Sequence, residues 1–217
     1  MKRALISRDG GAGDFHDPVK TTDRFASLLR KNGFTVETFD TLDCFSDPAY
    51  VRSFDLIVFS WTMAPPSRQA VSTIVGAVEG GVGLAGCHGG LCDSFRDDTD
   101  WQYLTGGQWV AHPGGGGVSY RVNIIKDCPI TENVPDFDLT SEQYYLHVDP
   151  SVDVLATTVF KNNVCGRDVT MPAAWCRNYG RGRVFYLSVG HDDEVFARSP
   201  ESEKLMERGM LWAAKAL

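Results

Sequence analysis

The 217-residue sequence lacks the patterns that mark several classes of protein. It has no run of basic residues, and 28 acidic against 21 basic side chains give a net charge of −7, which argues against a surface for nucleic acid or anionic membrane. The longest weakly polar stretch, 71–87, holds Glu79 and five glycines and is too short and polar for a membrane span. The apolar residues before Asp9 are too few for a signal-peptide core.

Cysteine is present but has no framework spacing. The six cysteines form no CxxC pair, so a structural zinc site of that kind is not expected. Because nothing marks export, we expect a cytoplasmic protein with reduced thiols and no disulfides. A chain of this length can bury roughly 70% of its unfolded surface, so it needs neither disulfides nor a structural metal to fold. With 43% hydrophobic and 23% charged residues, the composition is typical of a globular protein.

Strand and helix signals alternate through the first half of the chain. Apolar runs predict buried parallel strands over 2–7, 35–39, 55–61 and 82–85. Thr21–Asp23 predicts the start of a helix that ends at Asn32–Gly33, and Pro65–Pro66 predicts the start of another that reaches about Glu79. This order predicts a parallel sheet with helices on both faces.

The second half is less regular. Strands are predicted over 118–125, 143–146, 152–158, 173–177 and 183–189, and the last helix over about 201–216. No long helical pattern separates these strands, so we expect some to be antiparallel. No linker or repeat interrupts the chain. We therefore expect one doubly wound α/β domain over residues 1–217, with an exposed edge in the second half that would let two copies pair as a homodimer.

In such a sheet, ligands bind at the carboxyl ends of the strands. Four residues stand at or just after the ends of predicted strands, and we expect them at one edge: Asp9, Trp61, His88 and His191. The glycines at 10–13 follow the first strand, where a dinucleotide fold places its phosphate loop. The third glycine of that motif is missing, Asp14 would repel a phosphate, and no GxxxxGK[ST] occurs, so no nucleotide cofactor is expected. We interpret the segment as a surface loop that covers a pocket with Asp9, His16 and Asp17.

The segment GLAGCHGG at 83–90 matches the spacing of a nucleophile elbow, G-x-Nu-x-G. Its glycines let the chain turn sharply and present His88 as an exposed ring over the end of the sheet. An imidazole there can act as a base, a metal ligand or a nucleophile, but it is not the Ser or Cys of acyl transfer. The alternative is a glycine-rich turn with an incidental histidine.

Other polar residues carry weaker signals. His191 follows Gly190 at the end of the last strand, where the acids at 192–194 would orient its ring, or it is a capping or surface residue. Glu142 begins a predicted strand beside Tyr144, a position usually held by a solvated edge residue. His112 and His147 are lone histidines in loops. The charged residues at 93–100 are expected to form a solvated face.

Several motifs in order resemble one family. GLAGCHGG, TGGQWVAHPGG, CPIT, SEQYYLHVDP, VLATT and MPAAWCRNYGRGRVFYLSVGHD resemble the trehalose-utilisation, ThuA-like family, most densely from Leu84 to Asp192. The family is similar in fold to class I glutamine amidotransferases, which implies a flavodoxin-like sheet. It also implies a role in the catabolism of disaccharides or other carbohydrates, including 3-keto sugars.

The resemblance carries over to particular residues. His88 takes the elbow position of the amidotransferase cysteine, His191 the position of their catalytic histidine, and Glu142 falls in the family's acidic-Tyr motif. His112 and His147 belong to the form of the motifs seen here. The family's N-terminal loop often has several histidines, whereas this loop has only His16, which leaves its role open. Cys87 precedes the elbow apex, so glutamine hydrolysis is not expected.

Two functions of different classes follow. The first is an enzyme acting on a disaccharide or 3-keto sugar, with His88, Glu142 and His191 as acid/base groups or as ligands of Zn, Mn or Fe. The second is a non-catalytic carbohydrate-binding or regulatory protein on an amidotransferase-like scaffold. In either, the residues expected to contact the sugar are Asp9, Trp61, His112, Tyr144 and His147, with Trp61 and Tyr144 stacking on its rings.

Overall fold

The computed structural model describes residues 1–10 and 16–217. Its strands are β1 (Arg3–Arg8), β2 (Thr35–Phe39), β3 (Leu56–Ser60), β4 (Gly83–Cys87), β5 (Gly107–Ala111), β6 (Val118–Ile124), β7 (Phe137–Ser141), β8 (Tyr145–Val148), β9 (Asp153–Phe160), β10 (Val169–Tyr179) and β11 (Gly182–Leu187). Its α-helices are α1 (Pro18–Lys31), α2 (Pro48–Val51), α3 (Arg68–Glu79), α4 (Gly89–Cys92), α5 (Thr99–Thr105), α6 (Asp193–Arg198) and α7 (Pro200–Ala213). Gly11, Gly13 and Asp14 of the glycine-rich loop lie outside these residues.

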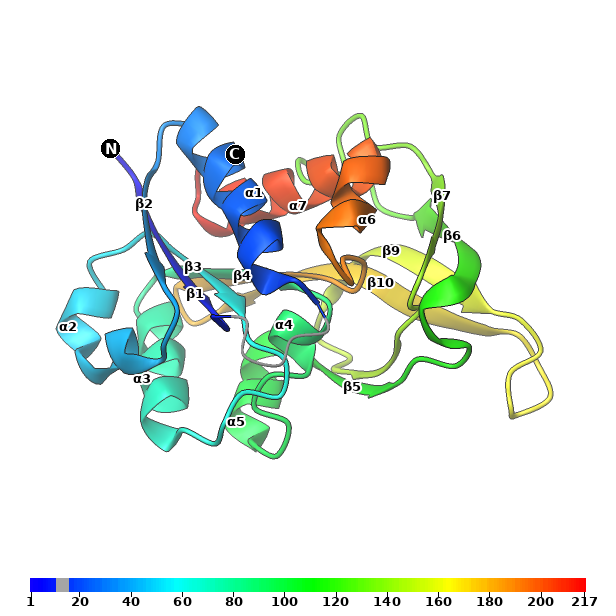
Figure 1. The fold of residues 1–217 in the computed structure, drawn as a ribbon, viewed down its shortest axis with the longest axis horizontal. Helices are drawn as coiled ribbons and strands as arrows, with labels where there is room; N and C mark the ends of the chain where they lie inside the picture. Colours follow the sequence, from blue (N-terminus) through cyan, green and yellow to red (C-terminus); the bar gives the residue numbers. More distant parts are fainter. Residues whose placement is uncertain (11–15) are drawn as a thin grey trace.

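Within the described part of the chain, nine strands form one sheet in the order β2-β1-β3-β4-β11-β10-β9-β6-β7 (Figure 1). The first five are parallel and follow the flavodoxin-like order, with β11 in the fifth place. From β10 to β7 the sheet is antiparallel. The predicted doubly wound sheet with antiparallel strands in its second half is therefore confirmed.

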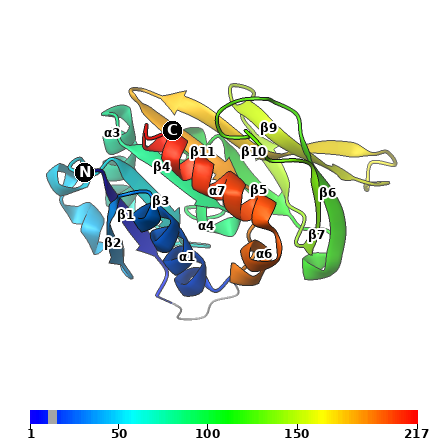
Figure 2. The ribbon, with the colours of Figure 1, turned by 90° about the horizontal axis from the view of Figure 1, so that it is seen from above.

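Helices cover both faces of the parallel part. Figures 1 and 2 show α1, α6 and α7 on one face, whereas α3, α4 and α5 lie on the other. Phe25 of α1 and Met206 of α7 are buried in the first layer, and Ile74 of α3 and Trp101 of α5 in the second. Of the helices in the described ranges, none has the length and apolar character needed to cross a membrane. All six cysteines lie in these ranges and are free thiols, as expected.

Two helices begin at residues other than those predicted. α1 starts at Pro18, and the Asp17 carboxylate caps it by accepting a hydrogen bond from the Lys20 amide. The predicted caps at Thr21–Asp23 lie inside the helix, and the Thr22 hydroxyl donates back to the Pro18 carbonyl. α3 starts after Ser67 rather than at Pro65–Pro66, since the Ser67 hydroxyl caps the Ala70 amide.

The second half differs more from its prediction. β5 and β7 were not expected, and α6 is a separate short helix before α7 because Ser199 caps a new helix that starts at Pro200. β8 starts at Tyr145 rather than at Gln143. Glu142 therefore does not begin a strand but lies in the connection between β7 and β8. This connection carries it toward the carboxyl ends of the parallel strands.

Candidate functional site

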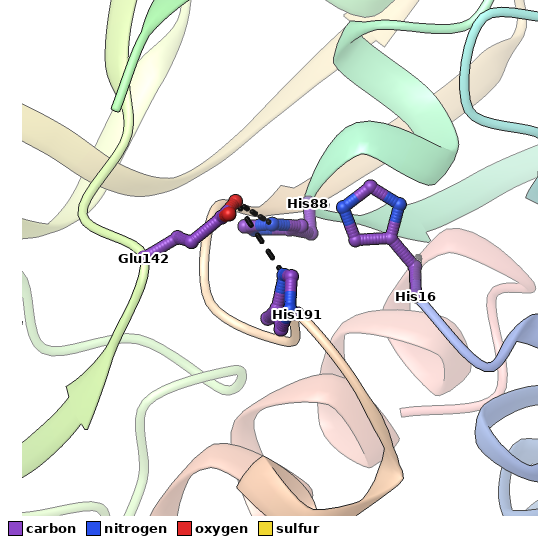
Figure 3. A group of neighbouring side chains, drawn as sticks. All are labelled: His16, His88, Glu142 and His191. Atoms are coloured by element: carbon purple, nitrogen blue, oxygen red, sulfur yellow. Dashed lines mark hydrogen bonds and ion pairs between the residues drawn. The ribbon is translucent and has the colours of Figure 1, made fainter. Parts of the chain in front are cut away.

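Three histidines and a glutamate from distant parts of the chain meet at the carboxyl end of the parallel sheet (Figure 3). His16 precedes α1, His88 follows β4, His191 follows β11, and Glu142 reaches in from the β7–β8 connection. One donor atom from each lies within 4.8 Å of the others. The structure thus brings together His88, Glu142 and His191, which the sequence singled out, and adds His16.

The turn at His88 has the geometry of a strained elbow. His88 has φ 49° and ψ −140°, a conformation that costs a non-glycine residue about 1–3 kcal/mol. Its flanking glycines permit close packing, since a Cβ on Gly86 would lie 2.7 Å from the Phe59 carbonyl oxygen. The ring differs from the expectation in one respect: it is buried, with 1% exposure, rather than exposed. His16, Tyr144 and Glu142 surround it, so it lies beneath the cavity instead of lining it.

Hydrogen bonds fix the tautomer of His88. Its Nδ1 lies 2.8 Å from the Ser188 carbonyl oxygen, which can only accept, so Nδ1 carries the proton. Its Nε2 lies 3.1 Å from Oε2 of Glu142. Burial lowers the pKa of His88, although the Glu142 and Ser188 contacts oppose this shift. In the neutral ring a lone pair on Nε2 faces a carboxylate oxygen, and the two acceptors need a proton or a cation between them.

The Glu142 carboxylate is the meeting point of the site. Its Oε2 also lies 3.4 Å from Nδ1 of His191 and 3.5 Å from Nδ1 of His112. Burial raises the pKa of Glu142, but the contacts of its carboxylate with His191 and His88 outweigh burial and hold the pKa well below its usual range. The carboxylate is therefore ionised, with three imidazoles around it.

His16 completes the cluster from the N-terminal segment. Its ring lies edge-on to His88 and His191, with centroids at 5.1 and 4.9 Å, and the Thr62 hydroxyl lies 3.0 Å from its Nδ1. Burial, followed by the neighbouring His88 and His191, lowers the pKa of His16 to about 3. The sequence left the role of this segment open. The segment follows the parallel strand β1, and this position was the sequence signal that could have placed His16 at the site.

Three tyrosines contact His88 and Glu142. Tyr144 stacks on the His88 ring at a centroid distance of 3.7 Å. The Tyr186 hydroxyl donates to the His88 carbonyl, and the Tyr120 hydroxyl donates to the Glu142 carbonyl. These contacts orient His88 and Glu142 before any ligand binds.

A cavity of about 490 Å³ opens above the cluster. Its wall includes Asp93 and Arg96, which were expected on a solvated face. Instead Asp93 is buried, because the short α4 turns the chain back after the elbow, and it binds Arg96 through two hydrogen bonds of 2.8 Å. Sequence reasoning also missed three other lining residues: Thr62, Met63 and Trp109.

The other predicted contact residues divide into two groups. Tyr144 and the partly exposed His112 line the cavity. Trp61 and His147 are not among the described residues that line it: Trp61 donates its indole N–H to Ser7, and His147 lies on the outer side of β8 at a different surface cavity. Asp9, whose amide donates to the Ser60 carbonyl, is also not among these lining residues.

Cys87 lies one residue before the elbow apex. It is buried, and burial raises the pKa of its thiol to about 12. A thiol with that pKa is protonated at neutral pH and is a poor nucleophile.

Comparison with known structures supports the same fold. A putative ThuA-like protein from Bacteroides uniformis is 20% identical with a TM-score of 0.76, and the match covers 98% of this chain and 91% of that one. One from Parabacteroides merdae is 16% identical with a TM-score of 0.77, covering 99% and 90%. A protein named cytoplasmic protein STM1381 from Salmonella typhimurium is 12% identical with a TM-score of 0.65, covering 99% and 98%. A comparison with curated proteins gave no significant match.

The sequence itself carries the family signature over almost its whole length. The model of the ThuA family, described as trehalose utilisation, matches residues 3–213. That span contains all four residues of the histidine–glutamate cluster and all five parallel strands. The chain belongs to the ThuA family.

Proposed function

We propose that this protein is a carbohydrate-catabolism enzyme that binds a Zn, Mn or Fe ion and acts on a disaccharide or 3-keto sugar. The observation that carries the proposal is the convergence of donor atoms from His16, His88, His191 and Glu142 within 4.8 Å. The family's description, trehalose utilisation, supports the substrate class.

The donor set fits a transition metal ion. Imidazole nitrogens with one carboxylate suit Zn, Mn or Fe better than Mg, which prefers oxygen ligands. A cation would also separate the two acceptors at His88 Nε2 and Glu142 Oε2, which lie 3.1 Å apart. Ser188 and Tyr144 hold the His88 ring, as the neighbours of metal ligands commonly do.

The chain's own residues would transfer the proton and hold the substrate. A bound ion would polarise a sugar carbonyl. His112 lies at the cavity wall, with Nδ1 3.5 Å from Glu142, and would accept a proton from the carbon beside that carbonyl. Arg96, fixed by Asp93, would hold the sugar hydroxyls. Isomerisation and elimination of a 3-keto sugar would both begin with loss of this proton, which His112 would then return to carbon in the first case or to the leaving hydroxyl or alkoxide in the second. In hydration His112 would instead take a proton from the water that adds to the carbonyl carbon.

A non-catalytic carbohydrate-binding or regulatory role is the alternative. The burial of His88 and the inert Cys87 favour it, because the elbow then offers no accessible nucleophile. We further propose a cytoplasmic location, which the six free thiols support, and pairing of two copies through the exposed sheet edge at β7.

The test combines elemental analysis with sugar turnover. Wild-type protein purified without chelator should carry close to one equivalent of Zn, Mn or Fe and convert 3-keto-trehalose. His88→Ala and His191→Ala should lose both properties, whereas Gln69→Ala, an exposed change on α3, should keep them. Bound metal without turnover would favour the binding role. Full activity in both histidine variants would refute the site.

A further inference from the structure

A second cavity adjoins the one above the histidines. Its volume is about 450 Å³, and it lies where the loop before α3 meets the loop before α5. Met63 and Arg96 line both cavities and form their common boundary. The two cavities are therefore neighbours, with these two side chains between them.

Arg96 is rigidly held at this boundary. Its Nε and Nη2 donate to the two carboxylate oxygens of buried Asp93, each at 2.8 Å, and its guanidinium lies 4.8 Å from the Trp109 ring centroid. Its side chain is still 42% exposed. No hydrogen bond from Nη1 to another described residue is found, so its N–H groups are available to a ligand. A guanidinium fixed in this way binds without losing much conformational freedom.

Met63 contributes an apolar surface at the same boundary. Its φ of 50° is a conformation that non-glycine residues rarely adopt, and its amide donates to the Asp93 carbonyl at 2.9 Å. Its side chain is 52% exposed. Residues held in rarely populated backbone conformations cluster at active sites and ligand-binding sites. The apolar C–H face of a sugar ring fits against such a side chain.

The charges around the second cavity favour an uncharged occupant. Two guanidinium groups, Arg68 and Arg96, and two carboxylates, Asp97 and Asp98, line this cavity, and Arg96 is already paired with Asp93. Asp98 also lies 3.8 Å from Arg68. A phosphate or carboxylate would be repelled by the acids as much as it is attracted by the arginines, whereas neutral hydroxyls can donate to one and accept from the other.

We propose that the second cavity is a subsite for the second, uncharged ring of a disaccharide, whose first ring lies above the histidine–glutamate cluster. The inference rests on the proposed function, since it takes the reacting sugar to bind at that cluster. Arg96 spans the junction between the rings, and Met63 packs against the second one. The site therefore selects for a two-ring substrate without a charged group.

The test uses 3-keto-glucose and 3-keto-trehalose as one-ring and two-ring probes in calorimetric titrations. Wild-type protein should bind the two-ring probe at least about tenfold more tightly, a difference that corresponds to about 1.4 kcal/mol. Asp97→Trp and Thr99→Trp place an indole in the second cavity from exposed positions and should abolish this preference. Both should keep wild-type metal content and one-ring affinity. Asp127→Trp, an exposed change that lines neither cavity, is the matched control for Asp97→Trp and should keep the preference.

The outcomes separate this inference from the proposed function. Suppose that wild-type protein carries metal and binds 3-keto-glucose but shows no two-ring preference, or that both indole variants keep that preference. Either result refutes the subsite and leaves the proposed function standing. If a two-ring phosphate ester binds more tightly than the neutral probe, the charge argument is refuted. If the protein holds no metal and binds neither sugar, the proposed function fails and this inference fails with it.

Discussion

His88 depends on its neighbours for the orientation of its ring. Ser188 accepts from Nδ1, Tyr144 stacks on one ring face, and Glu142 faces Nε2. Ser188 and Tyr144 contact Nδ1 and the ring face, and not Nε2, where the proposed ion would bind. Their role would therefore be to position the imidazole. The loss of a ligand and the loss of a positioning residue should therefore have different sizes.

Glu142→Gln removes the negative charge while keeping the side chain's size. We expect metal affinity to fall by more than the roughly 10–100-fold that loss of a positioning residue costs, because an amide oxygen binds a cation more weakly and no longer balances its charge. The loss of metal affinity in Tyr144→Leu should stay within that range of roughly 10–100-fold. Competition with a chromophoric chelator measures both. Glu132→Gln, at an exposed ion pair with Arg208, is the control.

Equal metal affinities for Glu142→Gln and wild type would contradict the assignment of Glu142 as a ligand. A loss in Tyr144→Leu as large as that in Glu142→Gln would show that the stack, and not the charge, holds the site together.

Single-residue signals predicted part of this site. His88 and His191 follow apolar strands at glycine turns, so the position of each relative to the sheet was readable from the sequence. Asp93 was misjudged because a carboxylate in a charged segment gives no local sign of burial. Only the turn of α4 brings it under Arg96. His16 had no periodic pattern around it, and its contact with Thr62 joins two separate loops.

At the scale of elements, the turn after β11 sets the position of His191. Gly190 has φ 121°, and a Cβ there would lie 2.6 Å from Phe196 Cζ and 3.1 Å from Cys87 Sγ. The turn is thus wedged between α6 and the strand that leads into the elbow. Any added side chain must displace one of them.

Gly190→Ala should destabilise the protein by more than about 2 kcal/mol, because backbone strain and overpacking both contribute. Gly115→Ala, at φ 65° with no atom within 4 Å of its added Cβ, isolates the backbone cost and should lose roughly 1 kcal/mol. Urea denaturation measures both free energies of unfolding. Similar losses for the two variants would show that the packing around Gly190 adjusts freely.

Arg24 joins the three helices on one face of the sheet. From α1 it binds both carboxylate oxygens of Asp193 in α6, at 2.6 and 3.0 Å, and Glu203 in α7 at 2.7 Å. About a quarter to a third of each side chain is exposed. The pairs therefore lie partly out of water and tie the segment after His16 to the helix after His191.

Arg24→Met keeps the aliphatic stem but leaves two partly buried carboxylates unpaired. We expect a loss of about 1–3 kcal/mol in the free energy of unfolding. Arg198→Met breaks an exposed pair with Glu194 on α6 and should change it by less than about 0.5 kcal/mol. Thermal and urea unfolding of both variants provide the comparison. An equal, small effect would mean that solvent screens the Arg24 pairs.

The elements of the first half were predictable because their signals are local. A parallel strand is an apolar run, and a helix start is a capping residue, although at α1 the cap was Asp17 rather than the threonines that follow. In the second half, β7 alternates buried and exposed residues over only five positions at a sheet edge. Its pairing with β6 decides that it is a strand, and a single sequence does not contain that information.

At the scale of the whole molecule, the cluster connects segments that are far apart in the sequence. Its members follow β1, β4, β7 and β11, so an ion held by all four would link both sides of the parallel sheet to the antiparallel extension. In the unfolded chain these donors are separated by tens of residues. An ion that binds the folded state alone must stabilise the fold as a whole.

If the proposed ion binds at this cluster, its removal should lower the melting temperature. At a free Zn²⁺ concentration 100 times the Kd, binding adds about 2.7 kcal/mol of stability. For a chain of this size each kcal/mol corresponds to roughly 2–4 °C, so we expect a shift of about 5–11 °C between chelator-treated and Zn²⁺-loaded protein. Mg²⁺ at the same concentration should produce little change, because it disfavours imidazole ligands.

Differential scanning calorimetry on wild type and Glu142→Gln separates this effect from unspecific binding. The variant should melt near the chelator-treated wild type whether or not Zn²⁺ is added, since the donor at the centre of the cluster has lost its charge. The three imidazoles alone would still attract Zn²⁺, so a small residual shift is consistent with the site. A full shift in Glu142→Gln would place the ion elsewhere, and the absence of any shift in wild type would mean that the four donors are held together by a shared proton instead of a metal.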